Sequence, residues 1–319
     1  MNIRMKILNF FLIAGVCFLF SGCHSVEKTE SQKKETASPS SDERYNDEQE
    51  GITGPGTETV SYGLYEMNGK LLDTSNIGHK DGKKYKKVLS FSHYVSVKRN
   101  YSLIILSDFQ AIPFKADNKK YSESYTFEMN ENTVRKIKLE FEIPHNHSEL
   151  SLLIIPEAEF QLETKNLDII SGLQEIFTLR YVQNTPNSNQ KDYLHPLQTT
   201  DELTGEEAFL TSHPQGSEIL YKVKSNKKAF LQVFNPHNRP LDYAIIAFSG
   251  NKQVKFNKQT VSYISVKKGS TNIYEVNIPQ VREKENYQIV LFPSPYKTGK
   301  IEEGINNRSY STLRTLIEP

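Results

Sequence analysis

From residue 58 to residue 319, apolar and polar positions alternate along much of the chain with a period of two. Such alternation is typical of a β-strand with one face in a core and the other in water. On one predicted strand, Lys138, Glu140 and Glu142 fall on the face opposite the apolar residues. The apolar faces of the two clearest strands consist of Leu89, Phe91, His93, Val95 and Val97, and of Ile137, Leu139, Phe141 and Ile143.

Continuous apolar runs over residues 103–106 and 152–155 predict central strands covered on both faces. Helical patterns are scarce. One short helix is predicted over residues 166–177, and a second over 200–209, where Thr204 and Glu207 have the spacing of a capping box. Further strands are predicted over residues 219–223, 230–234, 243–248, 261–266, 273–278 and 289–292.

The chain contains an internal repeat. Residues 101–107 (YSLIILS) resemble residues 243–249 (YAIIAFS), and Phe114 and Phe256 keep the same offset. Further along, residues 141–144 (FEIP) resemble 276–279 (VNIP), and residues 148–156 (SELSLLIIP) resemble 285–293 (ENYQIVLFP). We interpret these ordered matches as a duplication. The alternative is the chance similarity of any two domains with alternating apolar strands.

These patterns predict an all-β fold of two tandem β-sandwich domains, immunoglobulin-like in outline, after a disordered N-terminal stalk. Tyr and Phe, 17 of each, favour strands. Because the chain has no Trp, the Cys-Trp-Cys signature of true immunoglobulin domains is absent. The expected parts are a signal peptide over 1–22, a lipidated stalk over 23–57, a first sandwich over 58–181, a linker over 182–198 and a second sandwich over 199–319.

The first 23 residues have the three parts of a secretory signal. Arg4 and Lys6 make a positive start, residues 7–20 are apolar except for Asn9, and small residues precede Cys23. The apolar run is shorter than the roughly 20 residues that a transmembrane helix needs. An ordinary cleaved signal with an incidental cysteine and an uncleaved anchor are the competing interpretations.

The segment Phe20-Ser21-Gly22-Cys23 resembles the lipobox of bacterial lipoproteins, with Phe where Leu is preferred. This resemblance covers only the N-terminal segment. It implies cleavage after Gly22, S-diacylglyceryl modification of Cys23 and N-acylation of the new amino terminus. It also implies a protein held in the cell membrane by lipid and facing the extracytoplasmic side. The Lys-, Asn- and Ile-rich composition associates the chain with Gram-positive, single-membrane bacteria.

Residues 24–57 are polar and acidic, with a net charge of −4, and their few apolar residues are isolated. Such a segment buries too little surface to offset its chain entropy, so we expect a disordered stalk. The remainder from Glu58 onward carries +3, which is too weak a charge to indicate a nucleic-acid partner. Cys17 falls in the leader, so no disulfide is expected once Cys23 is lipidated.

The best candidate for metal ligation is residues 144–149 (PHNHSE), where His145 and His147 lie two residues apart. A solvated turn between two strands is the competing interpretation, and we favour it because the segment begins with Pro144. His93 is a candidate ligand that we interpret as a hydrogen-bonded histidine of the core or edge. No metal site and no cofactor is therefore predicted.

Glu157 and Glu159 are candidates for the two carboxylates of a glycoside hydrolase, although their spacing alone is weak evidence for such a pair. Tyr121 and Tyr125 are candidates for a stacking surface for sugars, with packing as the favoured interpretation. The sequence lacks the G-x-S-x-G, H-E-x-x-H and phosphate-binding glycine motifs.

The function expected is that of a non-catalytic binding or structural accessory module at the cell surface, not an enzyme. Its expected partners are the membrane, through the lipid on Cys23, and a protein or a wall polymer. The alternative is an extracellular hydrolase acting on cell-wall or glycan material. A solute-binding protein is disfavoured because that class has alternating helices and strands.

Overall fold

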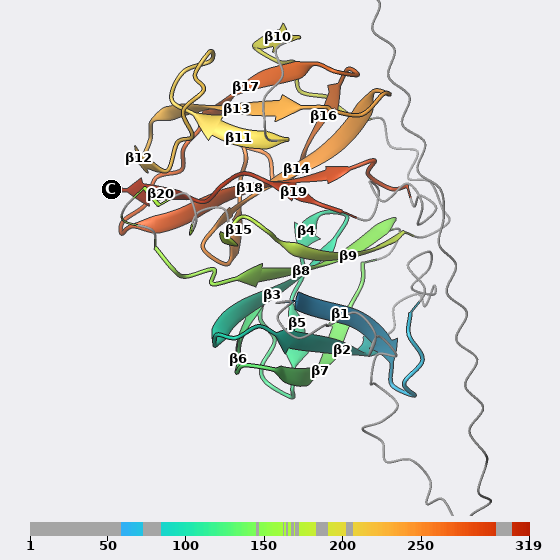
Figure 1. The fold of residues 1–319 in the computed structure, drawn as a ribbon. Coiled ribbons are helices and arrows are strands. Elements are labelled where there is room, and N and C mark those ends of the chain that lie inside the picture. The colour runs from blue at the N-terminus through green and yellow to red at the C-terminus, as the bar shows by residue number, and fades with distance from the viewer. Residues whose placement is uncertain are drawn as a thin grey trace, which may run out of the picture. The chain divides into compact units, whose positions relative to one another are not determined.

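The structure is a computed structural model. It describes residues 59–72, 84–144, 147–161, 163, 165–166, 169, 172–182, 191–201, 207–297 and 308–319. Within these residues twenty strands pair into four sheets (Figure 1). The fold class expected from the alternating pattern, all-β with two β-sandwiches, is confirmed by these sheets. The predicted signal peptide, Cys23 and the predicted stalk lie outside the described residues. Among the described residues, no helix is long and apolar enough to cross a membrane.

The first sandwich consists of sheets A and B. Sheet A has the order β1-β2-β7-β5, and in sheet B β3 pairs with β4, β6 and β8, while β8 also pairs with β9. Sheet A contains β1 (Thr59–Glu66), β2 (Lys84–Tyr94), β5 (Phe114–Ala116) and β7 (Thr133–Glu142). Sheet B contains β3 (Arg99–Ser107), β4 (Gln110–Ala111), β6 (Ser124–Met129), β8 (Glu149–Pro156) and β9 (Phe177–Val182).

The second sandwich consists of sheets C and D. Sheet C has the order β12-β20-β18-β14-β15, with β16 on β14 and β19 on β18, and sheet D has the order β10-β17-β13-β11. Sheet C contains β12 (Lys222–Lys224), β14 (Leu241–Ser249), β15 (Lys252–Val254), β16 (Ser262–Val266), β18 (Glu285–Pro293), β19 (Tyr310–Ser311) and β20 (Thr315–Glu318). Sheet D contains β10 (Gln198–Thr200), β11 (Ala208–Thr211), β13 (Lys228–Phe234) and β17 (Thr271–Asn277).

Three details of the predicted elements are wrong. Val97 is 46% exposed because β2 ends at Tyr94, before the apolar row reaches it. The helix predicted over 200–209 is replaced at its ends by β10 and β11, while residues 202–206 lie outside the described residues. In the helix predicted over 166–177, Ile169 and Gly172 are helical, but β9 already begins at Phe177.

The segments matched by the repeat occupy the same places in the two sandwiches. Tyr101 of β3 lies opposite Pro156 of β8, and Tyr243 of β14 lies opposite Pro293 of β18. Phe114 and Phe256 are both buried in the core of their own sandwich. The residues after the two prolines, Glu157 and Ser294, both have positive φ, 46° and 49°. The repeat in the sequence is therefore a repeat of strand order and register.

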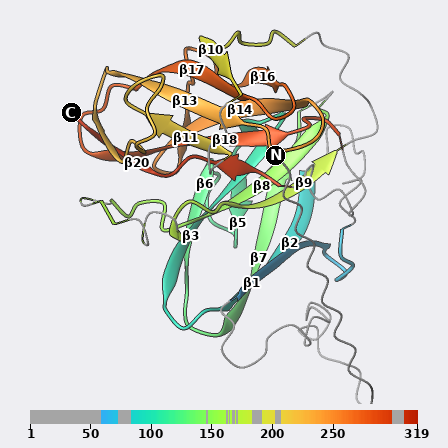
Figure 2. The same ribbon diagram turned by 45° about the horizontal axis from the view of Figure 1, so that its top comes forward.

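A third apolar layer lies between sheets B and C, in addition to the core of each sandwich. Odd-numbered residues of β3 such as Leu103 and Ile105 belong to the core of the first sandwich. The residues between them face the second sandwich, as do alternate residues of β14 and β18. We call this layer the seam, and the strands that border it, β3, β8, β14 and β18, are labelled in Figure 2. Its fully buried residues are Ile104, Leu106, Leu153, Ala244, Ile246, Val290 and Phe292.

Candidate binding site at the seam

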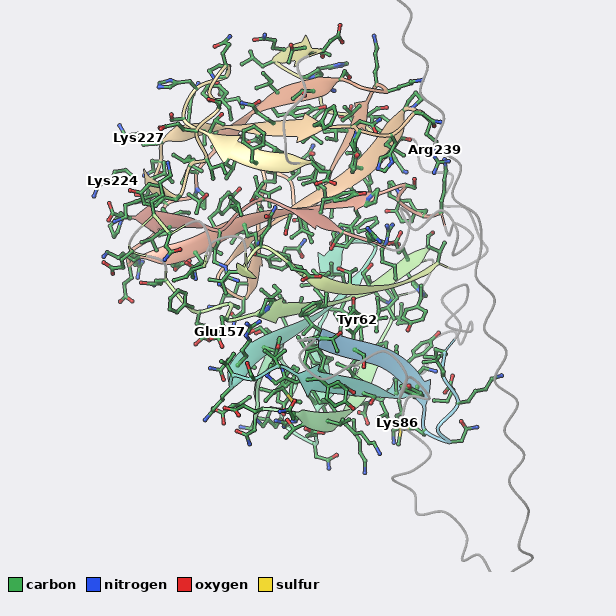
Figure 3. All side chains as sticks on the ribbon, viewed as in Figure 1. Tyr62, Lys86, Glu157, Lys224, Lys227 and Arg239 are labelled. Atoms are coloured by element: carbon green, nitrogen blue, oxygen red, sulfur yellow. The ribbon has the colours of Figure 1, made fainter. Side chains whose placement is uncertain are left out.

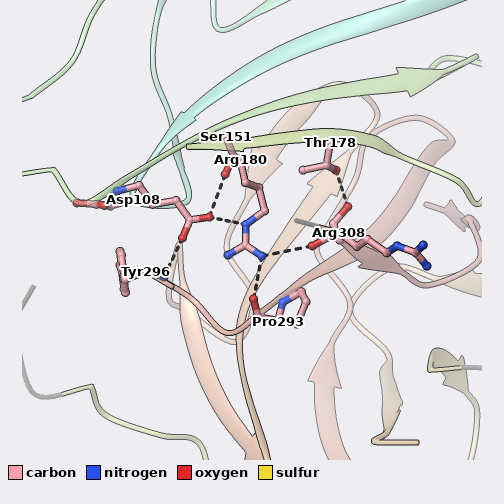
Figure 4. Close-up of polar contacts among 9 residues, drawn as sticks. Asp108, Ser151, Thr178, Arg180, Pro293, Tyr296 and Arg308 are labelled. Atoms are coloured by element: carbon pink, nitrogen blue, oxygen red, sulfur yellow. Dashed lines mark hydrogen bonds and ion pairs between the residues drawn. The ribbon is translucent and has the colours of Figure 1, made fainter. Parts of the chain in front are cut away.

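A buried ion pair fixes one end of the seam. Arg180 of β9 donates from Nε to Glu149 Oε1 at 2.6 Å, and the two side chains are 1% and 0% exposed. Glu149 also accepts a hydrogen bond from the backbone N–H of Tyr296 at 2.8 Å (Figure 4). Arg180 donates from Nη1 to the carbonyl of Pro293 at 2.8 Å. Because both charges are desolvated, removing either partner would cost far more than losing a surface pair.

Each sandwich donates an arginine hydrogen bond to a backbone carbonyl of the other. Arg180 of the first binds the carbonyl of Pro293 in the second, and Arg314 of the second donates from Nη2 to the carbonyl of Pro156 at 2.8 Å. Glu149 and Asn286 hold equivalent places, since their carbonyls accept from the N–H groups of Asp108 and Gly250 in the same way. Their side chains then reach across the seam in opposite directions, Glu149 to Tyr296 and Asn286 to the loop after β8.

Beside the ion pair, aromatic hydroxyls and one lysine close the seam. The hydroxyls of Tyr263 and Tyr296 lie 2.6 Å apart, and Lys191 Nζ lies 5.2 and 4.8 Å from the two ring centroids. Burial lowers the pKa of Lys191 and raises the pKa of Asp108, whose carboxylate accepts from the N–H groups of Ser148 and Glu149. These buried polar groups hold the two sandwiches in one arrangement.

A cavity of about 510 Å³ opens where the seam meets β1, β9 and β19. Thr178 Oγ1 and Ser309 Oγ lie 2.6 Å apart in its wall, and Gln174 donates from Nε2 to the carbonyl of Ser311 at 2.8 Å. Arg180 Nη1 lies 3.4 Å from the carbonyl of Arg308, so the buried ion pair supports this wall from behind. Its lining residues are Tyr62, Gln174, Glu175, Ile176, Thr178, Arg308, Ser309, Tyr310 and Ser311.

The cavity combines aromatic and charged groups from both sandwiches. The pKa of Tyr62 is raised, mainly because the side chain is buried, and the charge of Glu175 adds to this rise. A hydrogen bond with the Thr178 backbone and the charge of Arg308 act in the opposite direction. The centroid of the Tyr62 ring, labelled in Figure 3, lies 5.5 Å from that of the Phe177 ring. Among the described residues of the lining, Glu175 supplies the one carboxylate. Such a wall suits a polar ligand that stacks on tyrosine and hydrogen-bonds to hydroxyl and amide groups.

The structure accounts for several residues that the sequence singled out. His93 is fully buried and hydrogen-bonded, with Nδ1 2.9 Å from the Tyr101 hydroxyl and Nε2 2.7 Å from the Val97 carbonyl, as interpreted from the sequence. Tyr125 is packed in the first core and contacts Arg135. Tyr121, by contrast, is 41% exposed on the outer face of the first sandwich.

The two weaker chemical candidates do not form a site within the described residues. His145 lies outside them, and His147 is 5% exposed. Glu157 accepts a hydrogen bond from the Asn100 N–H at 2.7 Å in the turn after β8, while Glu159 is exposed. The described part of the chain contains no group of three or more His, Cys, Asp or Glu residues that could hold a metal ion.

The ion pair and the cavity were missed from the sequence. One signal was present: Arg180 is a lone charge within the apolar strand segment FTLRYV, and a charge in such a strand requires a buried partner. Glu149 begins an apolar segment, but nothing in the sequence pairs it with Arg180. The cavity lining comes from three distant parts of the chain, so no local pattern describes it.

No family model and no curated protein matches this chain. Among solved structures, it is similar to the chaperone DraB of E. coli at 10% identity, covering 81% of this chain and 96% of that one, with a TM-score of 0.24. The Salmonella enterica SafA pilin in complex with the SafB chaperone matches at 13% identity, 81% and 98% coverage and a TM-score of 0.24.

A third similar structure is red sea bream transglutaminase, at 8% identity and a TM-score of 0.19. The match covers 82% of this chain but spans only 31% of the transglutaminase. At these TM-scores none of the similarities supports a conclusion about function. The description of two β-sandwiches rests on the pairing of the strands.

Proposed function

We propose that this protein is a lipid-anchored, extracytoplasmic surface protein that acts as a non-catalytic binding module. The seam cavity is its ligand site, and a polar polymer of the cell envelope is its ligand. The observation that carries this proposal is a polar cavity whose walls come from both sandwiches and whose back is a buried ion pair. Such a wall is preorganised, which lowers the cost of binding.

The membrane attachment is supported by the sequence Phe20-Ser21-Gly22-Cys23 after a short apolar run. A single acyl chain binds a membrane only marginally, whereas a diacylglyceryl group with N-acylation supplies enough buried CH₂ groups for stable anchoring. The acidic segment over 24–57 would separate the folded part from the headgroups.

A binding role is favoured over hydrolysis by the composition of the cavity wall. Hydrolysis of a glycoside uses two carboxyl groups on either side of the bond, and the described residues that line the cavity supply one, that of Glu175. Of the two glutamates suggested by the sequence, Glu157 is engaged by the backbone of Asn100.

The anchor is tested by replacing Cys23 with Ser in the producing cell. We expect the wild-type protein in the membrane fraction, with an acylated N-terminal cysteine in its mass spectrum. Cys23→Ser should shift the protein to the soluble fraction. A variant that stays in the membrane fraction to the same extent would contradict the anchor.

The cavity is tested by sedimentation with purified cell-wall sacculi. We compare the double variant Glu175→Ala/Arg308→Ala with the matched control Glu218→Ala/Arg239→Ala. All four residues replaced in the two variants are exposed. The cavity variant should lose about tenfold in affinity, because it removes two polar contacts at the ligand. The control should bind as wild type does.

Equal binding by both variants would contradict the cavity as the ligand site. Release of soluble sugar from the sacculi, abolished by Glu175→Ala alone, would replace the binding module with the hydrolase alternative.

A further inference from the structure

The outer face of sheet A carries lysines in a row across three strands. Lys115 of β5 lies opposite Glu140 of β7, which in turn lies opposite Lys86 of β2. In the neighbouring rows Lys84 lies opposite Glu142, and Lys138 lies opposite Val88. Strands are about 4.8 Å apart, so the row spans roughly 10 Å.

One carboxylate is shared among several cations in this row. The carboxylate oxygens of Glu140 lie 3.6 Å from Lys84 Nζ, 3.9 Å from Lys86 Nζ and 3.7 Å from Lys115 Nζ. Glu140 also accepts a hydrogen bond from the Tyr121 hydroxyl at 3.1 Å. The side chains of Lys84, Lys86 and Lys115 are 51%, 65% and 38% exposed. The lysines outnumber the acids on this face and reach water, so an anion can approach them.

The row borders a hollow of about 230 Å³. Lys86, Lys115 and Lys138 line it together with Asn118 and Glu140, and Met67 forms an exposed apolar rim. The Tyr121 ring lies beside it, 4.8 Å from Lys115 Nζ. The surface is therefore concave and bears ammonium groups from three strands around a space of the size of a phosphate-bearing group.

The described residues of the second sandwich contain no such row at the equivalent positions, although the repeated strands keep the same pairing. Tyr85 lies opposite Phe141 just as Ala229 lies opposite Val276, so the two outer faces can be aligned position by position. Glu140 has an equivalent in Glu275, which pairs with Lys228. The residues at the places of Lys86, Lys115 and Lys138 are Phe230, Asn257 and Ile273. The fold itself does not require the three lysines.

We infer that the outer face of sheet A binds an anionic polymer whose repeating unit carries phosphate. Lysine ammonium groups are compact point charges with freely rotating donors, which suits phosphate oxygens presented at varying angles. A row about 10 Å long can contact more than one phosphate of an extended chain, and Tyr121 offers a ring for the unit between them. This inference does not depend on the seam cavity, which lies on other strands.

A polymer is favoured over a bilayer surface because the lysines surround a hollow. A headgroup layer is broad and lies against a flat or convex face, whereas a single chain can enter a groove. Within the hollow, Glu140 competes with the ligand for the same ammonium groups, so the site is selective for ligands with several negative charges.

The experiment measures binding of linear inorganic polyphosphate to the full chain carrying Cys23→Ser, which removes the lipid. The triple variant Lys86→Gln/Lys115→Gln/Lys138→Gln is compared with Lys224→Gln/Lys228→Gln/Lys268→Gln, which removes the same charge from the second sandwich. Figure 3 labels one lysine of each set, Lys86 and Lys224. We expect the sheet A variant to lose about tenfold or more in affinity at low salt, with a weaker salt dependence. The control should change less than about twofold.

A gain of affinity provides a readout that a folding defect would not produce. Glu140→Gln removes the competing carboxylate, so it should tighten polyphosphate binding severalfold. Vesicles of phosphatidylglycerol serve as the second probe. Equal losses in the two triple variants, or no polyphosphate binding, would overturn the inference. Lysine-dependent binding to the vesicles but not to polyphosphate would overturn it in favour of a membrane surface.

Discussion

The two sandwiches share strand order and register, yet they carry different polar residues at equivalent positions. Glu149 in the first sandwich corresponds to Asn286 in the second, and both reach across the seam. The Tyr101 hydroxyl is bonded to His93, whereas the equivalent Tyr243 hydroxyl is buried without a hydrogen bond among the described residues. The shared strand order and register therefore depend on the apolar alternation and on the turns after the prolines, and the polar residues at equivalent positions can differ.

This difference separates what the fold requires from what function could use. A residue type that the fold needs should occur in both halves, as the tyrosine opposite proline does. A residue type confined to one half, such as the lysines of sheet A, has no such explanation. Stability measurements on paired variants can break or sharpen this distinction, provided that unfolding is treated as one cooperative transition.

The largest expected effect is at Glu149. Glu149→Ala removes the carboxylate from the buried guanidinium of Arg180, so we expect the free energy of unfolding to fall by about 3–5 kcal/mol. Urea unfolding followed by circular dichroism measures it. A loss below about 1 kcal/mol would mean that the seam tolerates an uncompensated charge.

The equivalent change in the second half should cost less. Asn286→Ala removes a neutral amide that donates to the carbonyls of Ala158 and Phe160 at 3.0 and 2.8 Å. We expect a loss of about 1–3 kcal/mol in the same urea experiment, because the groups left behind carry no net charge. If Asn286→Ala lowered the free energy of unfolding more than Glu149→Ala does, the ion pair would not be the main polar interaction that stabilises the seam.

The equivalent tyrosines provide a third pair. Tyr101→Phe leaves Nδ1 of the buried His93 without its 2.9 Å partner, so a loss of about 1–2 kcal/mol is expected. Tyr243→Phe deletes a buried hydroxyl that makes no hydrogen bond among the described residues, so it should be neutral or stabilising. Thermal and urea unfolding of the two variants side by side would test this, and equal losses would contradict it.

The smallest expected effect is at the outer face of sheet A. Lys86→Phe installs the residue that the second sandwich has at the equivalent place, on a side chain that is 65% exposed. We expect the midpoint of thermal unfolding to stay within about 2 °C of wild type, as for most surface substitutions. A marked fall, with Lys224→Phe as the exposed control, would show that the lysine stabilises the fold after all.

Much of the fold could be predicted from the sequence. Apolar alternation is visible within each short segment, and the internal repeat is found by comparing the chain with itself. The faces of β7 follow from residues such as Leu139, and the correspondence of the two halves follows from repeated residues such as Tyr101 and Tyr243, whereas their pairing with Pro156 and Pro293 is seen only in the structure. The seam could not be predicted. The run over 103–106 indicated a strand covered on both faces, but an apolar face does not specify which surface covers it.

The candidate site was less accessible to sequence reasoning. Glu149 and Arg180 lie 31 residues apart, and Arg180 reaches Pro293 a further 113 residues away. No single sequence reports contacts at such separations. Conversely, the proposed lipid anchor at Cys23 rests on the sequence alone, since this residue lies outside the described residues. The candidate site and the proposed anchor thus rest on different kinds of information.

The reciprocal grip of Arg180 and Arg314 has the geometry of a symmetric dimer contained in one polypeptide. Its association is therefore a first-order process, and dilution cannot separate the halves. Cutting the chain between Val182 and Lys191 would turn it into a bimolecular equilibrium. The concentration at which the two fragments then part would report directly how tightly the sandwiches bind each other.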